Sequence, residues 1–554
     1  MKKKTPRKCQ RLVHNLRSNW SILSITSSST SNQLRRRASV LLLALVVIVL
    51  LTLGAVSFFE RMFVEHQATR AHIRQAQARY LAESGVEFIR AMATQDPNTL
   101  MQSGGTYNNP TLFQGKLVLD DELAAFRGRF TVVAPAVNEA GYFAGIRYGL
   151  ENESARLNLN TVLLADQYEE GGAQKLLMTL PGMTEPIADA ILDWIDPDSD
   201  QRTLGAEQEY YSSLSPPYAP RNEPLGSIEE LLLVRDVTPA LLFGADLNRN
   251  SLIEANEQPY TVIEGADNSG GLLNRGWAAY LTIDSAERNT KPDGTPKIDV
   301  NMQDLKELHT QALQVLDEPM ANFLVAYRQG GPEDEERPGR RGGGGRTVEA
   351  AGLELDFDLP GRERFNNLLD LVGARTQVVE QSQAGQQPRE PPTCESPFTE
   401  DASAMREYIP KLFDNFSVNS STSIPGRINI NQAPRVLLVG IPGLDSTAID
   451  QIISSRQPDA NGERPEQAYE TWPLVSGIVD LETMKQLMPL VTAGGNVYRA
   501  QIVGYFDEEG PAYRMEAIVD ATQSPPVVKR RRDLVEQGPG YTLDVLGTTV
   551  EDGP

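Results

Sequence analysis

An uncharged, strongly apolar stretch near the N-terminus constrains this chain more than any other feature. It runs from Ala38 to Phe59, which is 22 residues, directly after three arginines, and the next charged residue is Glu60. A helix of this length spans a hydrocarbon core of about 30 Å. The stretch therefore predicts a membrane-spanning helix, with an ordinary signal anchor as the simplest alternative. A cleaved secretory signal fits less well, because small residues would follow its apolar core, whereas Ala38 and Ser39 precede this one.

Charge is divided sharply along the chain. Residues 1–38 contain ten Lys/Arg and no acidic residue, so the remainder carries 42 basic and 74 acidic residues, a formal charge of −32. A basic leader before the span predicts a cytoplasmic N-terminus and an acidic body on the other side of the membrane. Such a body is a poor partner for nucleic acid and a good one for divalent cations. The two cysteines, Cys9 and Cys394, exclude a disulfide framework, since cleavage would remove the first.

Helical periodicity continues beyond the membrane segment, so one helix is expected over residues 39–95. Its block RQAQARYLAESGVEF, residues 74–88, together with the basic leader resembles the start of the type II secretion system minor pseudopilin K family (general secretion pathway protein K). The resemblance implies cleavage by a prepilin peptidase between Ala38 and Ser39, and a methylated prepilin-type N-terminus. The family usually has Gly where this chain has Ala38. Pilins generally carry Glu at the fifth position of the mature chain. Counted from Ser39, this position is Leu43, and the absence of Glu is what the K resemblance predicts.

The expected fold class is α+β. Alternating apolar residues predict strands within 116–150 and a β-meander over 495–535. The resemblance implies the pseudopilin fold, in which a long N-terminal membrane-spanning helix packs on a small antiparallel sheet, here with a large inserted helical domain. The expected segments are a leader at 1–38, the insertion at 151–490 with linkers at 329–347 and 376–399, and a tail at 536–554. A short amphipathic helix is also predicted over 362–373.

Three short stretches repeat one pattern of a basic residue, an apolar residue, Asn or Asp, an apolar residue and Asn. They are RLNLN at 156–160, KIDVN at 297–301 and RININ at 427–431. The first and third lead into apolar-Pro-Gly-apolar turns between helical segments. This pattern predicts two helix-hairpin-helix (SAM-like) units, at about 156–240 and 427–490, with Thr184 and Asp445 placed to cap the second helix of each hairpin.

The segment DLNRNSLIEANE, residues 246–257, matches a twelve-residue EF-hand loop. Five oxygen-bearing side chains and one backbone carbonyl fall at ligand positions: Asp246, Asn248, Asn250, Leu252 through its carbonyl, Glu254 and Glu257. Ser251 replaces the usual Gly, at a position that needs a left-handed conformation. The segment predicts a Ca²⁺ site, and the alternative is a polar surface loop.

A second acidic run offers hard oxygen ligands at alternate positions, which suits Ca²⁺ without matching a full template. Its candidate ligands are Asp196, Asp198, Asp200 and Glu207. An ordinary acidic turn after a helix explains the same residues equally well.

Catalysis finds little support, because three of the four histidines lie in the leader (His14) or flank the membrane segment (His66 and His72), and no nucleophile, zinc or phosphate-loop motif occurs. The expected function is that of a minor pseudopilin supporting protein secretion across the outer membrane, at the pseudopilus tip. The resemblance implies an inner-membrane protein with a periplasmic body. Its partners would be minor pseudopilins of the I and J types, the pseudopilus and prepilin peptidase.

Two alternatives remain open at this point. One is a minor pilin of type IV pilus assembly. The other is a membrane-tethered DNA-binding protein, because residues 427–456 resemble the hairpin of competence DNA receptors. Those hairpins usually carry a second Gly where this chain has Thr184 and Asp445, and a carboxylate there repels phosphate. We therefore expect no nucleic-acid partner.

Overall fold

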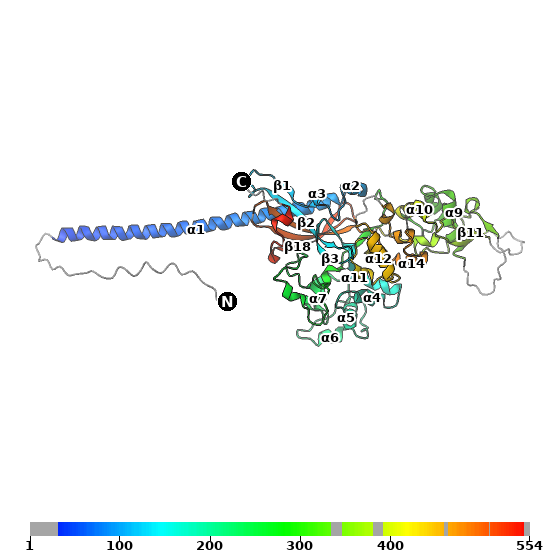
Figure 1. The fold of residues 1–554 in the computed structure, drawn as a ribbon, viewed down its shortest axis with the longest axis horizontal. Coiled ribbons are helices and arrows are strands. Elements are labelled where there is room, and N and C mark those ends of the chain that lie inside the picture. Colours follow the sequence, from blue (N-terminus) through cyan, green and yellow to red (C-terminus); the bar gives the residue numbers. More distant parts are fainter. Residues whose placement is uncertain (1–30, 334–345, 380–391, 459–463, 509, 548–554) are drawn as a thin grey trace. The chain divides into compact units, whose positions relative to one another are not determined.

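The computed structural model describes residues 31–333, 346–379, 392–458, 464–508 and 510–547 (Figure 1). The chain divides into two compact units, Met1–Ile73 and Arg74–Pro554. The described part of the first unit is a single helix, α1 (Ser31–Met92), whose last residues belong to the second unit. This helix begins within the predicted leader, of which residues 1–30 lie outside the described residues.

The second unit contains a seven-stranded antiparallel sheet. Its strands are β1 (Lys116–Leu119), β2 (Gly128–Val137), β3 (Phe143–Tyr148), β4 (Glu151–Asn152), β16 (Val497–Phe506), β17 (Tyr513–Asp520) and β18 (Val527–Asp533). The order is β1-β2-β16-β17-β18, with β3 paired to β2 and β4 paired to β16. The sheet thus joins strands from both ends of the sequence, and the expected combination of an apolar N-terminal helix with a mixed helix and sheet body is confirmed.

The C-terminal part of α1 packs on one face of this sheet. Ala78, Ala82, Val86 and Ile89 are fully buried there, in a cluster that also contains strand residues such as Ile502. A Cβ added at Gly504 of β16 would lie 2.2 Å from the Ala78 carbonyl oxygen and 2.5 Å from the Ala82 nitrogen. Glycine at this position is therefore what allows the helix backbone to reach the strand.

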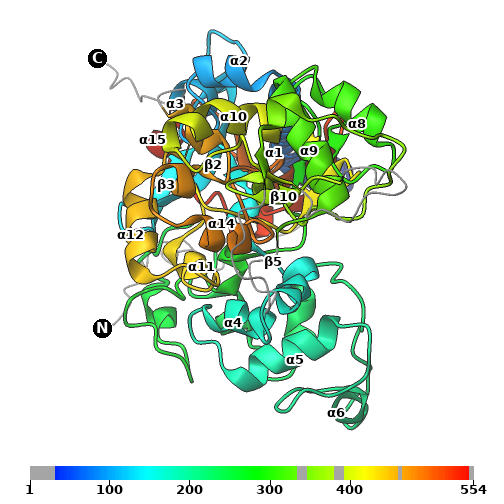
Figure 2. The same ribbon diagram turned by 90° about the vertical axis from the view of Figure 1, so that its right-hand side faces the viewer.

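The long segment between β4 and β16 contains more helix than strand. The helices of the second unit after α1 are α2 (Pro97–Gln102), α3 (Pro110–Phe113), α4 (Gly172–Met178), α5 (Glu185–Ile195), α6 (Gln208–Ser212), α7 (Pro239–Phe243), α8 (Leu305–Ala312), α9 (Glu318–Gly330), α10 (Ala402–Asn415), α11 (Arg435–Leu438), α12 (Ser446–Ser455), α13 (Trp472–Val475), α14 (Leu481–Leu487) and α15 (Leu543–Leu546). Helices α4, α5 and α6 lie together, apart from α9 and α10 (Figure 2).

Each of the three repeated stretches forms a two-residue strand that pairs in parallel with a strand later in the chain. The pairs are β5 (Leu157–Asn158) with β6 (Leu281–Thr282), β8 (Ile298–Asp299) with β12 (Phe416–Ser417), and β14 (Ile428–Asn429) with β15 (Val491–Thr492). Two further small sheets join β7 (Ala286–Arg288) to β13 (Ser423–Pro425), and β10 (Arg375–Gln377) and β9 (Thr347–Val348) to β11 (Thr393–Glu395). Each repeated stretch therefore marks a place where a later segment of the chain returns and closes a long loop.

The last Asn of each repeat holds a distant segment in place. Asn160 donates from its amide to the Leu225 carbonyl at 3.1 Å and accepts from the Leu225 N–H at 2.7 Å. Asn301 makes the same pair of bonds with Phe365, at 3.1 and 2.9 Å. Asn431 donates to the Gln467 carbonyl at 2.9 Å. An amide side chain supplies both a donor and an acceptor, and Asn160 and Asn301 use both. Asn431 uses its donor, while its Oδ1 is buried without a partner among the described residues.

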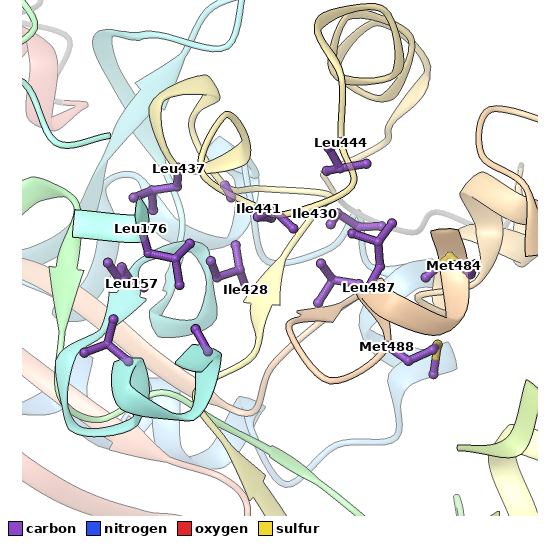
Figure 3. Close-up of a cluster of buried hydrophobic side chains, with 14 of the residues drawn as sticks. Leu157, Leu176, Ile428, Ile430, Leu437, Ile441, Leu444, Met484, Leu487 and Met488 are labelled. Carbon is purple, nitrogen blue, oxygen red and sulfur yellow. The ribbon is translucent and has the colours of Figure 1, made fainter. Parts of the chain in front are cut away.

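Each segment predicted as a hairpin contains a helix, a tight turn and a second helix, with φ of 68° at Gly182 and 85° at Gly443. That these segments are helix-hairpin-helix units stays a prediction. Asp445 caps α12 through the Ala448 N–H at 2.7 Å, while Thr184 stands at the N-cap of α5 without a side-chain hydrogen bond. Figure 3 shows that Leu157 and Leu176 of the first hairpin unit share a buried cluster with Ile428, Leu437 and Ile441 of the second. Residues 459–463, in the second predicted hairpin unit, lie outside the described part of the chain.

Three segment predictions need correction. The linkers predicted at 329–347 and 376–399 are structured at both ends, by α9 and β9 and by β10 and β11, and only 334–345 and 380–391 lie outside the described residues. Residues 362–373 form no α-helix, and only Leu368–Leu371 make a 3-10 turn. The predicted tail packs on the sheet through α15, where the Leu546 carbonyl accepts from the Thr131 hydroxyl at 2.7 Å; residues 548–554 are not described.

A buried ion pair ties the start of the insertion to the middle of the sheet. The fully buried Glu153, in the 3-10 helix η1 (Glu153–Ala155), accepts from Arg499 Nε of β16 at 2.5 Å and also from the Thr282 hydroxyl. Burial alone would raise the pKa of Glu153, but the charges of Arg499 and Arg156 lower this pKa below its ordinary value. The carboxylate is therefore ionised in the folded protein.

Gly504→Ala should lower the free energy of unfolding by about 3 kcal/mol, because the added methyl group displaces α1 from the sheet. Gly494→Ala is the matched control, since nothing lies within 4 Å of a Cβ there. Urea unfolding of the soluble part, from about residue 65 onward, measures both. Equal stability of the two variants would contradict the close approach of α1 to β16.

Glu153→Gln should destabilise the protein by about 3 kcal/mol at pH 7, because Arg499 loses its closest buried partner. A depressed carboxyl pKa contributes stability above the unfolded-state pKa, and this stability is lost as the pH falls through the folded-state value. As the pH falls below about 5, the free energy of unfolding of the variant should therefore decrease less steeply than that of the unchanged protein. Glu264→Gln, at an exposed position, should keep the slope of the unchanged protein.

Candidate functional site

The N-terminal half of α1 is the first functional element. Apolar side chains from Val40 to Phe59 are exposed all around this helix, and Leu43 is 66% exposed. Within the described residues it is the one helix that is long and apolar enough to cross a membrane. The predicted processing residues, Ala38 and Ser39, lie in this same helix, at the start of the apolar run. The arrangement fits a single-pass membrane anchor.

The loop 246–257 folds its main chain around Asp246. This side chain is 5% exposed, and its two carboxylate oxygens accept from the N–H groups of Asn250 at 3.0 Å and Ser251 at 2.8 Å. Ser251 has a φ of 68°, so it adopts the left-handed conformation that its place in the EF-hand pattern requires. Burial raises the pKa of Asp246 above its ordinary value.

Glu257 closes the other side of the loop. It is fully buried, and its oxygens accept from the backbone N–H of Asn248 at 3.2 Å and of Glu254 at 3.1 Å. Within the described residues it forms no ion pair. Glu254 accepts from the Asn250 amide at 3.0 Å, and Leu252 donates its N–H to Asn250. The six predicted ligands therefore belong to one compact turn.

The acidic side chains of this turn do not converge on a single point. Across the part of the chain that the structure describes, no group of three His, Cys, Asp or Glu side chains is arranged as a ready metal site. The acidic oxygens of the loop are instead satisfied by its own N–H groups. A cation would have to share or replace these hydrogen bonds.

Three hydrogen bonds attach the loop to the sheet and to the C-terminal segment. Gln501 of β16 donates to the Arg249 carbonyl at 2.8 Å, and Arg514 of β17 donates to the Asn248 carbonyl. The Asn250 amide donates to the Gly540 carbonyl at 2.7 Å. The loop is thus a joint between the insertion and the sheet, which its sequence does not reveal.

The second acidic run is only partly brought together. Asp196 and Glu207 are 7% and 4% exposed, whereas Asp198 and Asp200 are exposed at the surface. Burial, followed by the charge of Asp198, raises the pKa of Asp196 to about 7. Burial and the charge of Asp193 also raise the pKa of Glu207. Asp200 only donates its N–H to Asp198, at 2.9 Å.

Three buried oxygens near this run lack a hydrogen-bond donor in the structure. They are Asp196 Oδ1, Glu207 Oε1 and Asn222 Oδ1. Arg202 is the nearest cation, with its guanidinium 3.7 Å from Asp196 Oδ2 and 3.5 Å from Asp193 Oδ1. Asn222 was not predicted as a candidate ligand, since it comes from a separate loop and no local pattern marks it. Buried acceptors without donors are unusual in folded proteins, and they suit a hard cation.

Comparisons with known proteins give a family-model match that includes the acidic run, and weak structural likenesses. Residues 155–243 match the family model of type II secretion system protein K. No curated protein matches the chain. A chain in the crystal structure of the GspK-GspI-GspJ complex from the enterotoxigenic Escherichia coli type 2 secretion system is 14% identical. The aligned region covers 85% of this chain and 99% of that one, with a TM-score of 0.30, which is too low to support an argument. The match of residues 155–243 confirms the resemblance to the type II secretion system protein K family that the sequence predicts.

Proposed function

We propose that the chain is a minor pseudopilin of a type II secretion system. The observation that carries the proposal is the combination of the protein K match at residues 155–243 with a helix whose first half is apolar and whose second half packs on an antiparallel sheet. The role is assembly rather than turnover. The apolar half holds the subunit in the inner membrane, with the body in the periplasm, until neighbouring pseudopilin helices replace the lipid around it.

Leu43 supports a place at the tip of the pseudopilus. A carboxylate at this position would neutralise the N-terminus of an adjacent subunit, and the exposed leucine side chain cannot do so. The helical insertion adds bulk beyond the sheet, which would obstruct stacking of a further subunit. Minor pseudopilins of the I and J types are the proposed neighbours. A type IV pilus subunit remains the alternative within the same architecture.

The hairpin geometry argues against the DNA-binding alternative. The Asp445 carboxylate occupies the Ala448 N–H, one of the amides that a phosphate would need. Glu185 stands in the first turn of the corresponding helix α5. Both hairpins thus present acidic groups at the helix start, and the body carries a large excess of negative charge.

Blocking processing should separate a pseudopilin from a simple signal-anchored protein. In peptidase-positive cells we expect the mature chain to begin at Ser39, and Ala38→Leu to retain the leader and to abolish secretion, because the uncleaved N-terminus cannot enter the filament. Ala44→Leu, inside the apolar run, is the control and should be processed normally. N-terminal sequencing and the amount of exported protein outside the cell are the two readouts. Secretion that is unaffected by the retained leader would contradict the proposal.

We further propose that the body binds Ca²⁺ at the loop 246–257 and at the acidic run. The donor set at both places consists of oxygens only, which is what Ca²⁺ prefers. At the loop, the left-handed Ser251 and the buried Glu257, which forms no ion pair among the described residues, support the proposal. At the acidic run, Asp196 and Glu207 would supply carboxylates, and the unpartnered Asn222 oxygen adds a third ligand.

Melting curves in EGTA and in millimolar Ca²⁺ test this proposal. A ligand that binds only the folded state at a hundredfold excess over its Kd adds about 2.7 kcal/mol. Glu257→Ala should remove most of the Ca²⁺-dependent rise in Tm, whereas Ser251→Gly should keep or strengthen it, because Gly adopts a positive φ without strain.

Asp196→Asn distinguishes the second site from the first. In EGTA this variant should raise the Tm, because it removes a carboxylate that burial and Asp198 destabilise, and in Ca²⁺ it should lose part of the rise. Glu264→Gln is the control for a lost surface charge. Coinciding curves in EGTA and Ca²⁺ for the unchanged protein would show that both segments are ordinary acidic turns.

A further inference from the structure

A cavity of about 510 Å³ lies in the second unit, between the sheet and the insertion. The sheet contributes Arg499 and Gln501 of β16 and Glu516 of β17, and the insertion contributes Arg249 and Arg275. Its volume falls within the range of small-molecule sites in proteins. Neither the sequence patterns nor the secretion role accounts for it.

The cavity wall is basic, although the chain as a whole is acidic. Eight Arg and Lys residues line it, against five Asp and Glu residues, in a chain whose formal net charge is −22. Four of its acids pair with four of its cations: Glu151 with Arg156, Glu516 with Arg499, Asp284 with Arg530 and Glu229 with Arg532. The fifth acid, Asp246, accepts from amides of its own loop.

Two arginines of the cavity remain without an ion pair among the described residues. The Arg275 guanidinium stacks on the Phe143 ring, 4.4 Å from its centroid, and its Nε and Nη1 atoms are buried without an acceptor. The Arg249 guanidinium stacks on the Phe243 ring at 4.5 Å. Glu151 and Asp246 lie near enough to act on Arg275 electrostatically, but other groups already occupy them.

Stacking fixes the planes of the two guanidinium groups, and both residues line the cavity. Planar guanidinium groups are the side chains best suited to two-point recognition of carboxylate, phosphate or sulfate oxygens. A buried cation without a partner costs free energy that a bound anion would recover. Two positive charges that form no ion pair among the described residues match a ligand of charge −2.

We propose that this cavity binds a small oxyanion of charge −2, with Arg249 and Arg275 as its principal ligands. Phosphate, sulfate and short dicarboxylates share this chemistry. The cavity shares Asp246 with the proposed Ca²⁺ ligands. The proposal does not depend on the secretion role. Loss of secretion activity and loss of anion binding are therefore separate outcomes.

Thermal unfolding and calorimetry of the full chain in detergent test the proposal. The probes are sodium sulfate, phosphate and succinate, compared with sodium chloride at the same ionic strength, all in EGTA so that calcium salts do not form. We expect a saturable rise in Tm and a 1:1 binding heat with at least one dianion and none with chloride. Preference for phosphate and sulfate would identify an inorganic ligand, and preference for succinate an organic acid.

Variants show whether the response comes from this cavity. Arg249→Gln and Arg275→Gln should each weaken binding at least tenfold, and Arg406→Gln, at an exposed position of α10, should leave it unchanged. Arg275→Lys keeps the charge but loses the planar edge, so it should also bind more weakly. Circular dichroism confirms that each variant is folded. Equal responses to chloride and dianions, or unchanged binding in both glutamine variants, would overturn the proposal.

Discussion

The hydrogen bonding of β16 is the constraint on which the rest of the second unit depends. This strand lies between β2 and β17 and also pairs with β4, so residues more than 340 positions apart in sequence become direct neighbours, as Arg499 and Glu151 do. The insertion must therefore leave the sheet at β4 and return to the same place. Loop closure on this scale is entropically costly, although the cost grows only slowly with length.

The three repeated stretches help the insertion to return to the sheet, because each closes a part of it. Each forms a short parallel strand pair, and its last Asn holds another segment of its own region. The insertion thus consists of three consecutive closed loops, so the distance that the chain must span between β4 and β16 is divided into shorter parts. The Glu153–Arg499 pair links the start of the insertion to β16. A buried pair is weak evidence for net stability, but it links the start of the insertion to β16, because removing Glu153 would leave Arg499 without its closest partner.

Sequence patterns predicted the local features of this fold, and the family resemblance implied one sheet built from both ends of the body, but the pairings inside the insertion were missed. The apolar helix, the alternating strands and the Pro-Gly turns follow from periodicity and backbone preference, which act within a few residues. The role of Asn160, Asn301 and Asn431 did not follow, because their partners lie 36 to 65 positions away. The predicted linkers and tail look flexible by composition, yet their ends are held by strands β9 to β11 and by α15, whose contacts are with distant parts of the chain.

The candidate sites also divide into those that lie in one short segment and those that only the fold assembles. The loop 246–257 was predicted from spacing because all its ligands and its left-handed residue lie in one short segment. Asn222 and the arginines of the cavity come from separate segments, so only the folded chain brings them together. Asp246, Arg249 and Ser251 line that cavity and also belong to the loop. A cation on one side of this loop and an anion on the other would each act on the same backbone. Any coupling between them must be reciprocal, because the change in affinity that one ligand causes equals the change that the other causes in return.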